Sequence, residues 1–505
     1  MTSGHLEVET KYDVDEAFVV PDVGGIAGVA SVDAPVEHHL EAVYFDTTDL
    51  RLLRSRVTLR RRTGGTDAGW HLKLPAGTAR RELHAPLGRA VKRPPPALLE
   101  PVTGVVRGEV PRPVATLHTR RVVTTLRGPA GQLLAEIADD TVTASVPPTG
   151  PGTPIQVHAW REVEVELGTG DDALAAAVGE RLTEAGARPS ASASKVGRVL
   201  GQRLAEVAGP VPHDREPKDA GEFVLDALTG QIAALQAADV LLRTDQPDAV
   251  HQIRVAARRL RSTLSAFRSV LDRAATGPIR DELSWLGGQL AEARDAEVAL
   301  EHLRAVVAAQ PDELVLGPVG ARLQQTEIQE AQAGSDRARL TLSERRYLDL
   351  LDALHGLLAD PPFTARAGDR VRPVLRKATH RSVRKLRRRL GAARRAHGDG
   401  GPEALHAVRK AAKQVRYTAE VGGGEVADMA SVARSAKRVQ KVLGELQDTV
   451  VTRELCRRLG VVAMAAGENS FTYGRLHALE EERAERAIEK FWALLPKVRA
   501  ALRAG

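Results

Sequence analysis

The sequence predicts an α+β protein of two domains: a mostly antiparallel β domain over residues 1–204 and an all-helical domain over residues 221–505. The first 200 residues alternate short runs of β-forming residues with Gly- and Pro-rich turn signals. From about residue 221 the chain is rich in Ala, Leu and Arg with a 3.6-residue period, which is typical of amphipathic helices. Residues 205–220 are polar and contain three prolines, so we expect a linker there.

Length and composition narrow the class of protein. A chain of 505 residues exceeds what one hydrophobic core usually serves. The single cysteine, Cys456, excludes a disulfide framework and any cysteine-based zinc or iron–sulfur site. No uncharged apolar run is long enough to span a bilayer, and no apolar segment follows the N-terminus. We therefore expect neither a membrane span nor a signal peptide, and a cytoplasmic location.

The charge of the chain is unevenly distributed. Residues 1–200 hold 23 Lys and Arg against 25 Asp and Glu, whereas residues 201–505 hold 49 against 40. A neutral first part followed by a basic second part indicates two modules, the second facing a polyanion. Aromatic residues make up only 3% of the chain, which argues against a surface that stacks nucleic-acid bases.

Strands are expected around residues 6–12, 54–62, 70–75 and 160–167, and helices near 94–107 and 171–187 interrupt them. Alternate residues of a strand share one face. A half-solvated sheet would alternate polar and apolar residues, but here the charged faces also sort by sign. The run 160–167 aligns three glutamates, and the run 54–62 aligns four arginines. Grouped carboxylates suit a hard divalent cation, and rows of Arg and Lys suit phosphate oxygens.

These runs resemble the CYTH domain of the triphosphate tunnel metalloenzymes over about residues 3–200. The resemblance rests on the E-x-E-x-K motif of Glu7, Glu9 and Lys11, followed in order by YFDTTDLRLLRSRVTLRRR, WHLKLP, LAEIADDTV, WREVEVEL and SASASK. It implies an eight-stranded antiparallel β-barrel with flanking helices. The lumen of such a barrel would bind a linear triphosphate together with a divalent metal, Mg²⁺ or Mn²⁺.

The family pattern also implies individual site residues. Metal is implied at Glu7, Glu9, Asp140, Glu162 and Glu164. Phosphate is implied at Lys11, Arg60, Arg62, Lys73, Arg121 and Lys195. The implied catalytic group comprises Glu7, Glu9, Lys11, Glu162 and Glu164. Arg120 is the alternative to Arg121, and strand parity makes Arg56, Glu136 and Glu166 secondary candidates. No general base can be assigned from the sequence.

The helical part contains an internal repeat, in which HQIRVAARRLRSTL at 251–264 matches HAVRKAAKQVRYTA at 406–419. At about 100° per residue, each copy places one histidine and three basic residues on a single stripe. A third stripe lies in residues 370–395, which hold 12 Lys and Arg and no acid. One basic helix face is usually just solvated, but stacked like charges cost stability. Their repetition therefore indicates a polyanionic ligand.

These stripes resemble the CHAD domain, a conserved-histidine helical module, over about residues 221–500. The resemblance implies two four-helix bundles with pseudo-two-fold symmetry, whose basic surfaces bind inorganic polyphosphate. The implied contact residues are His251, Arg254, Arg258, Arg261, His380, Arg384, His406, Arg409, Lys413 and Arg416.

The leading functional prediction is a cytoplasmic enzyme that hydrolyses inorganic triphosphate in its barrel and binds long-chain polyphosphate through its helical domain. Polyphosphate granules are a candidate location. Thiamine triphosphatase and adenylate cyclase activities are alternatives within the same class, and a non-catalytic polyphosphate-binding adaptor is an alternative from another class. Nucleic-acid binding is disfavoured because no helix-turn-helix or RNA-module signature is present. No membrane partner is expected, and the oligomeric state is open.

Overall fold

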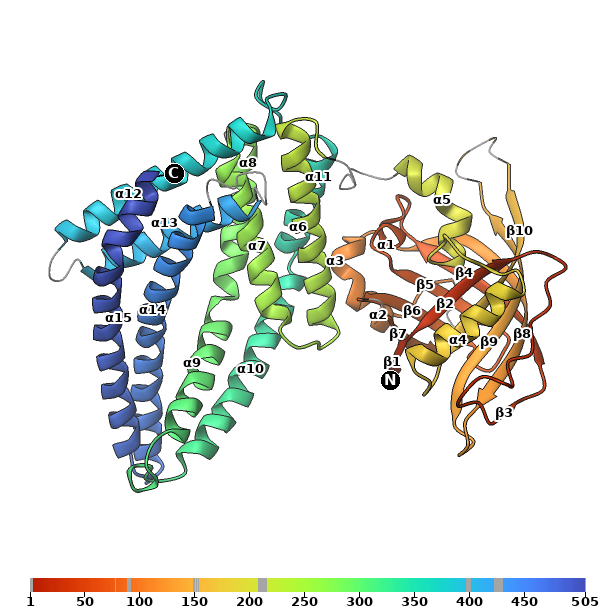
Figure 1. Ribbon diagram of the computed structural model, residues 1–505, viewed down its shortest axis with the longest axis horizontal. Coiled ribbons are helices and arrows are strands. Elements are labelled where there is room, and N and C mark those ends of the chain that lie inside the picture. Colours follow the sequence, from red (N-terminus) through yellow and green to blue (C-terminus); the bar gives the residue numbers. More distant parts are fainter. Residues whose placement is uncertain are drawn as a thin grey trace. The chain divides into compact units, whose positions relative to one another are not determined.

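The computed structural model describes residues 3–77, 79–88, 92–148, 150, 152, 154–207, 216–396, 401–421 and 430–504. Contacts between Cα atoms divide the chain into two compact units, Met1–Ala208 and Gly209–Gly505. The first, the β unit, is built on a sheet, and the second, the helical unit, is built from helices (Figure 1). The predicted two-domain α+β class is confirmed. Residues 208–215 of the expected linker lie outside the described residues.

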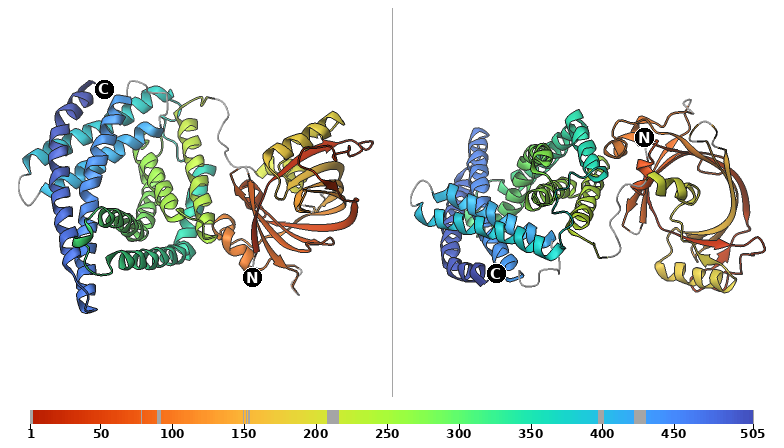
Figure 2. Two further views of the ribbon diagram at one scale, coloured as in Figure 1. Left: turned by 60° about the horizontal axis from the view of Figure 1, so that its bottom comes forward. Right: turned by 90° about the horizontal axis from the view of Figure 1, so that it is seen from above.

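The β unit contains one antiparallel sheet, which is strongly curved (Figure 2). Its order is β1-β7-β6-β5-β4-β8-β9-β10-β2-β11, and β3 pairs with β8. The described strands are β1 Ser3–Glu7, β2 Glu9–Val14, β3 Ser31–Val32, β4 Val36–Asp46, β5 Thr58–Thr63, β6 Gly69–Ala76, β7 Ala79–Pro86, β8 Arg112–Arg127, β9 Leu133–Val146, β10 Gln156–Leu167 and β11 Arg188–Pro189.

The hydrogen-bond pattern corrects the expected closed, eight-stranded barrel. The sheet of the described residues has eleven strands and is not closed. β1 and β2 are two parts of one extended segment that is interrupted at Val8; β1 pairs with β7, and β2 pairs with β10. Because each part serves a different neighbour, no single ladder joins the two ends of the sheet. Eight longer runs remain when β1 and β2 are taken together and the two-residue β3 and β11 are set aside.

The packing of α4 explains why the charged face of β10 is the inner one. Val163 and Val165 of β10 pack in one hydrophobic cluster with α4 (Asp172–Glu184). Since side chains alternate along a strand, Glu162, Glu164 and Glu166 of β10 point away from α4, to the inner face. Val142 of β9, which shares a face with Asp140, packs in another cluster with α5 (Lys195–Val207), so α5 lies on the inner face. The predicted helices near 94–107 and 171–187 are confirmed as α2 (Pro96–Leu99), the 3₁₀ turn Glu100–Val102, α3 (Thr103–Val106) and α4.

The predicted strand at 54–62 begins later than expected. A short helix, α1 (Arg51–Arg54), precedes β5, and Arg56 lies in the turn between them with φ of 58°. The carboxylate of Asp46 accepts hydrogen bonds from two backbone N–H groups of α1, each at 2.9 Å, which stabilises this helical turn. Arg56 is exposed, so its expected place on the inner face is wrong.

The helical unit follows the order of the internal repeat. Its described helices are α6 Ala220–Arg243, α7 Ala249–Ala266, α8 Arg273–Gln289, α9 Ala291–Ala308, the 3₁₀ turn Asp312–Leu314, α10 Val319–Ser343, α11 Arg345–Ala359, α12 Val371–Arg395, α13 Gly401–Val421, α14 Ala430–Ala465 and α15 Phe471–Ala504. By order, α6 and α7 correspond to α12 and α13. The pair α8–α9, interrupted at Leu290, corresponds to the continuous α14, and α10–α11 corresponds to α15.

Packing in the helical unit differs from two separate bundles. One core joins α6, α7, α8 and α11 with parts of α10 and α12, and a second joins α12 to α15. A third core contains side chains of α9, α10, α14 and α15, including Leu300, Leu323, Leu455 and Leu476. This third core lies where the ends of those four helices meet, at the lower tip of the unit in Figure 1. The two repeats therefore pack against each other in one shared core at this end.

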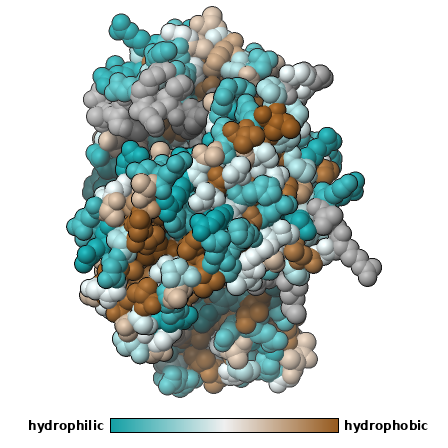
Figure 3. Space-filling model, turned by 90° about the vertical axis from the view of Figure 1, so that its right-hand side faces the viewer, coloured by the Kyte–Doolittle hydropathy of each residue, from teal (hydrophilic) through white to brown (hydrophobic). Residues whose placement is uncertain are grey.

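The first helix of the unit also has a length and hydropathy compatible with crossing a membrane. In the structure, Val224, Leu228, Ile232 and Leu235 of α6 are buried in the first helical core, so α6 serves as a core helix. On the face seen in Figure 3, hydrophobic side chains gather in a few groups between hydrophilic ones.

Candidate functional site

The inner face of the sheet surrounds a cavity of about 720 Å³ in which acids and bases face each other. Acids come mainly from β1, β2, β9 and β10, and bases mainly from β5, β6 and β8. Its charged lining residues are Glu7, Glu9, Glu82, Glu136, Glu164, Glu166 and Asp67, together with Lys11, Arg60, Arg62, Lys73, Arg80, Arg121 and Lys195. Nine of the eleven residues implied for metal and phosphate thus line one cavity. The other two, Asp140 and Glu162, lie beside it.

Strand register brings three of these acids together. Glu162 lies opposite Asp140 in the β9–β10 ladder, and Glu164 follows on the same face of β10. The carboxylate oxygens of the three residues lie within 4.8 Å of one another and are buried. Hard divalent cations prefer such oxygen ligands, so the donor set fits Mg²⁺ or Mn²⁺.

This acidic triad carries its own counter-charges in the structure. The Lys195 ammonium, at the start of α5, lies 2.9 Å from Asp140, 2.7 Å from Glu162 and 2.6 Å from Glu164. Arg121 donates two hydrogen bonds to Asp140, at 2.8 and 2.6 Å. Burial alone would lower the pKa of Lys195, but the three carboxylates raise it above its ordinary value. A metal at this triad would therefore share the carboxylates with Lys195 or displace it.

A second row of acids lies next to the triad and carries less counter-charge. Glu166 of β10 is paired in register with Glu136 of β9 on one side and with Glu9 of β2 on the other. Glu9 has Lys11 at 3.1 Å. Burial, followed by the negative charge of Glu7, raises the pKa of Glu166 to about 7. These carboxylates also fit a divalent cation, because an added positive charge would stabilise the ionised form of Glu166.

The lysines of the cavity bridge its acidic wall. Lys11 contacts both Glu9 and Glu164, and Lys73 lies 2.5 Å from Glu7. Burial would raise the pKa of Glu164, but Lys11, Lys195 and Arg121 lower it well below its ordinary value. The carboxylate of Glu164 is therefore the point where the acidic and basic halves of the cavity meet.

The basic wall centres on two arginines of β5. Arg60 is opposite Tyr44 of β4 and His71 of β6, and its guanidinium lies 4.0 Å from Glu82. The Nε atoms of Arg60 and Arg62 are buried without a hydrogen-bond partner. Unpaired buried donors are costly, and phosphate oxygens would satisfy them.

Sequence reasoning missed Tyr44, Arg80, Glu82 and His84, which all line this cavity. Glu82 of β7 contacts His71 at 2.5 Å and Lys73 at 3.7 Å, and Tyr44 interacts with Arg60. The alternation of Arg80, Glu82 and His84 was a usable signal, because all three line the cavity. The alternative phosphate contact, Arg120, instead points outward and pairs with the exposed Glu37 at 2.6 Å.

The raised pKa of Glu166 gives a pH prediction for the metal-free protein. Between the ordinary value of 4.5 and about 7, the folded state retains a proton that the unfolded chain has released. Stability is therefore lost as pH rises through this window. We expect Glu166→Gln to melt close to the wild type at pH 5 and about 5 °C higher at pH 8, since about 2 kcal/mol corresponds to several degrees in a domain of this size.

Thermal melts at both pH values in chelator check this expectation. The matched control is Glu41→Gln. Glu41 also lies on a strand of the antiparallel sheet, β4, but its side chain is exposed. If Glu166→Gln stabilised the protein equally at both pH values, the raised pKa of Glu166 would be contradicted.

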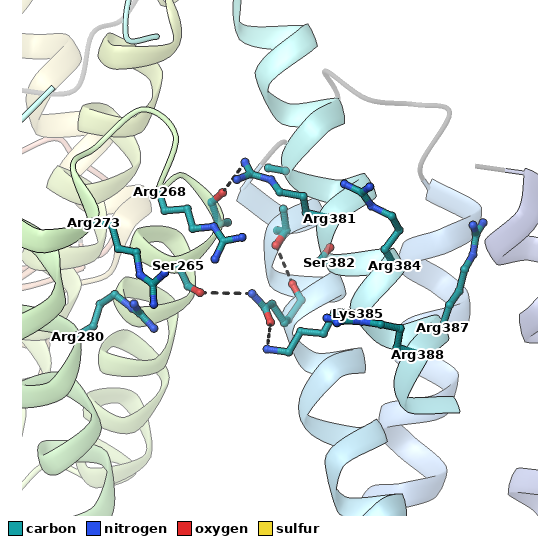
Figure 4. A pocket seen from close by; sticks show the side chains of 14 residues that line it. Ser265, Arg268, Arg273, Arg280, Arg381, Ser382, Arg384, Lys385, Arg387 and Arg388 are labelled. Carbon is teal, nitrogen blue, oxygen red and sulfur yellow. Dashed lines mark hydrogen bonds between the residues drawn. The ribbon is translucent and has the colours of Figure 1, made fainter. Parts of the chain in front are cut away.

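The helical unit contains a second, purely basic cavity of about 760 Å³ between α7–α8 and α12–α13 (Figure 4). Cationic side chains converge on it from both sides, and none of its described lining residues is an acid. The charged lining residues are Arg268, Arg273, Arg280, Arg381, Arg384, Lys385, Arg387 and Arg388. Burial and then neighbouring arginines lower the pKa values of Arg381 and Lys385. This cavity, here the basic pocket, therefore has no counter-charge among the residues that the structure describes around it.

The predicted stripes lie mostly beside the basic pocket. Of the ten implied contact residues, Arg384 alone is among its lining residues. The stripes of α7 and α13 instead approach each other around Tyr417, whose ring lies under Arg258 at 5.2 Å and Arg416 at 4.5 Å. Arg261 is close enough to the pocket's Arg280 for their repulsion to lower its pKa, after the effect of burial. The α7 stripe thus borders the pocket.

The remaining predicted residues of the helical unit have separate surroundings. Arg254 donates to the carbonyl of Ala291 at 3.0 Å, and His406 contacts Gln447 at 3.0 Å. His406 lines a different cavity between α13, α14 and α15, so it is not brought together with the α7 stripe. His251, Lys413, Arg409 and His380 are half-buried on α7, α13 and α12. Periodicity could not reveal the pocket residues Arg268, Arg273 and Arg280, because they lie outside the repeated motif.

Known protein families match both parts of the chain, and two known proteins match it over its whole length. Residues 5–199 match the CYTH domain, and residues 226–457 match the CHAD domain. Two proteins of Mycobacterium tuberculosis, described as "Uncharacterized protein MT2285" (strain CDC 1551 / Oshkosh) and "Uncharacterized protein Rv2226" (strain ATCC 25618 / H37Rv), are each 40% identical over 514 residues. The matches cover 99% of this chain and 97% of each relative.

Two solved structures each resemble one part of the chain. The CHAD domain from the plant Ricinus communis is 24% identical, with 59% of this chain and 97% of that one covered and a TM-score of 0.44. A putative adenylyl cyclase from Hippeastrum, described as having a dominant triphosphatase activity, is 16% identical, with 39% of this chain and 96% of that one covered and a TM-score of 0.24. The two domain matches and the full-length relatives together show that the chain belongs to the family of proteins that join a CYTH domain to a CHAD domain.

Proposed function

We propose that the β unit is a metal-dependent phosphoanhydride hydrolase that converts inorganic triphosphate to pyrophosphate and phosphate. The observation that carries this proposal is the sorting of charge inside one cavity of about 720 Å³. Its acidic rows offer oxygen ligands to a divalent cation. Its basic wall offers Arg60, Arg62 and Lys73 to the negative charge of a short phosphate chain.

In this reaction, the oxygen of water forms a bond to the terminal phosphorus, and the bond from that phosphorus to the bridging oxygen breaks. Mg²⁺ or Mn²⁺ held by the acidic rows would neutralise part of the negative charge of the substrate and would make the attacking water more acidic. The arginines and lysines hold the chain in line and stabilise the charge that develops on the leaving pyrophosphate. Lys11 and Arg121, which reach the acidic triad from neighbouring strands, orient its carboxylates.

A phosphate-release assay tests the proposal. Purified protein is offered tripolyphosphate, thiamine triphosphate, ATP and long-chain polyphosphate, each with Mg²⁺ or Mn²⁺. We expect tripolyphosphate to be hydrolysed fastest and chelator to abolish release. Preference for thiamine triphosphate would indicate a thiamine triphosphatase instead. Formation of cyclic AMP from ATP would indicate an adenylate cyclase. Binding of tripolyphosphate without turnover would leave a non-catalytic adaptor.

Removing a cation from the basic wall should weaken substrate binding. Lys73→Ala and Arg60→Ala are each expected to raise KM for tripolyphosphate about 10- to 100-fold, as expected for loss of a charge-assisted contact. A smaller fall in kcat should accompany it, because developing charge is less well compensated. Steady-state kinetics check this, and the exposed Arg120→Ala is the control. Unchanged KM in both variants would contradict their placement on the substrate.

For the helical unit, we propose binding of inorganic polyphosphate in the basic pocket and along the bordering stripes. The supporting observation is that the Nε atoms of Arg258, Arg280 and Arg409 are buried without a hydrogen-bond partner among the described residues. Eight cations around one cavity of about 760 Å³ would each gain from a flexible chain of phosphates. A cytoplasmic location, with polyphosphate granules as one site, is part of the same proposal.

A further inference from the structure

The loop between β5 and β6 brings an acid to the edge of the phosphate-binding wall. Gly65, Thr66 and Asp67 of this loop line the cavity of the β unit. The carboxylate of Asp67 forms an ion pair with Arg62. The side chain of Arg62 is only 7% exposed, whereas that of Asp67 is 52% exposed. Asp67 therefore reaches Arg62 from the solvent side of the cavity.

The fold holds this loop in place. Gly64 and Gly65 have φ of 79° and 72°, where side chains are disfavoured. A Cβ on Gly64 would lie 2.0 Å from the carbonyl oxygen of His39, and one on Gly65 would lie 2.8 Å from the side chain of Leu40. The loop is thus packed directly against β4. In addition, Nε2 of His71 lies 3.0 Å from the backbone oxygen of Asp67.

The charges around Arg62 explain why it needs an anion. Burial, followed by the positive charges of Arg60 and Arg121, lowers the pKa of Arg62 to about 9. An anionic partner relieves this repulsion. In the proposed reaction the partner is a phosphate oxygen, but without substrate Asp67 is the carboxylate that reaches Arg62. Phosphate and Asp67 therefore compete for one guanidinium.

We propose that Asp67 is a built-in competitor of the substrate, an acidic gate that must release Arg62 before a phosphate can occupy this end of the cavity. This inference rests on the proposed phosphate-binding role of the β unit and adds a residue that sets its affinity. The exposed side chain of Asp67 can turn into solvent without moving the loop backbone, so the gate opens by side-chain rotation. Its cost is a weaker affinity for the substrate.

The test is a double-mutant cycle on the full-length protein, with tripolyphosphate binding measured by calorimetry in chelator. We expect Asp67→Asn to bind about tenfold more tightly than wild type, because Arg62 loses its competitor but the loop keeps a side chain of the same shape. Arg62→Ala should bind more weakly. In the Arg62→Ala background, Asp67→Asn should give no further gain.

A matched control is Asp33→Asn, because Asp33 pairs with the partly exposed Arg127 at 2.7 Å and does not line the cavity. This variant removes the same charge and should leave the affinity unchanged. Equal affinities for wild type and Asp67→Asn, or an equal gain from Asp33→Asn, would overturn the gate. If Arg62→Ala has no effect on binding, both the proposed gate and the assignment of Arg62 to phosphate binding are wrong.

The hydrolysis assay is run separately on the same variants, so that the two proposals can fail independently. Tighter binding by Asp67→Asn without turnover by any form would support the gate and reject the hydrolase. Turnover by the wild type, together with an unchanged affinity in Asp67→Asn, would support the hydrolase and reject the gate.

Discussion

Replacing Glu164 by Gln should reduce the rate of tripolyphosphate hydrolysis on the order of 100- to 1,000-fold, the loss typical of a group that acts on transition-state charge. The side chain of Glu164 contacts Lys11, Arg121 and Lys195 and belongs to the triad that fits a divalent cation. Gln keeps the shape of the side chain but removes the charge that both the metal and the three cations require. Steady-state kinetics over a range of Mg²⁺ and Mn²⁺ measure the effect.

The loss must be separated from unfolding, because removing one partner of a buried ion pair also costs stability. Melting temperature and circular dichroism of Glu164→Gln report on the fold. Glu41→Gln serves again as the control, since the exposed Glu41 is outside the cavity. A folded Glu164→Gln variant with turnover within about threefold of the wild type would remove Glu164 from the catalytic group.

The largest effect on the helical unit is expected from Arg268→Ala, Arg384→Ala and Arg388→Ala combined. All three line the basic pocket, and their charges repel Arg381 or Lys385. Their removal should therefore weaken binding of long-chain polyphosphate at least about tenfold at low salt without destabilising the fold. The slope of log affinity against log salt should fall by about two, because three fewer counterions are released.

Binding titrations at several salt concentrations check both numbers, with chelator present to prevent metal-dependent hydrolysis by the β unit. The matched control removes the same charge elsewhere: Arg304→Ala, Arg457→Ala and Arg458→Ala together. These three arginines are exposed and pair with acids. An equal loss in both triple variants would show that net charge, not the pocket, governs binding.

A competition experiment decides whether the basic pocket selects its polyanion. A cavity of about 760 Å³ between helices can admit a thin phosphate chain. It cannot admit a DNA duplex, which is wider than its own major groove of about 12 Å. Duplex DNA of equal charge should therefore compete poorly at fixed ionic strength. If duplex DNA competed as well as polyphosphate, the helical unit would bind polyanions in general and would not select polyphosphate.

Strand parity predicted most of the cavity because the period of a strand is fixed at two. Glu162, Glu164 and Glu166 could be assigned to one face from sequence alone, and the valines between them pack under α4. Parity failed at Arg56 because it presumes an unbroken strand, and the hydrogen bonds of Asp46 impose a helical turn there. The interruption at Val8 was equally hidden, since it arises from pairing with two different neighbours.

Helical periodicity predicted less of the basic pocket than of the core. The repeated motif located α7 and α13, whose apolar positions are buried, but a stripe does not reveal which neighbour it faces. The pocket depends on residues from α8 and α12 that share no motif with α7. Gln414, a position where the repeats differ, contacts both Lys385 and Ser265 across the pocket, and only the tertiary structure could show this.

The interrupted N-terminal segment has a consequence for the order in which the β unit is made. The partner of β1 is complete once residue 86 has been synthesised, whereas the partner of β2 is complete only at residue 167. At roughly 5–20 residues per second, the second pairing follows the first by about 4–16 s. During that interval Glu9 and Lys11 have no opposite strand, and Lys195 follows later still. The nascent chain therefore acquires the basic wall of Arg60, Arg62 and Lys73 first and the acidic triad of β9 and β10 last.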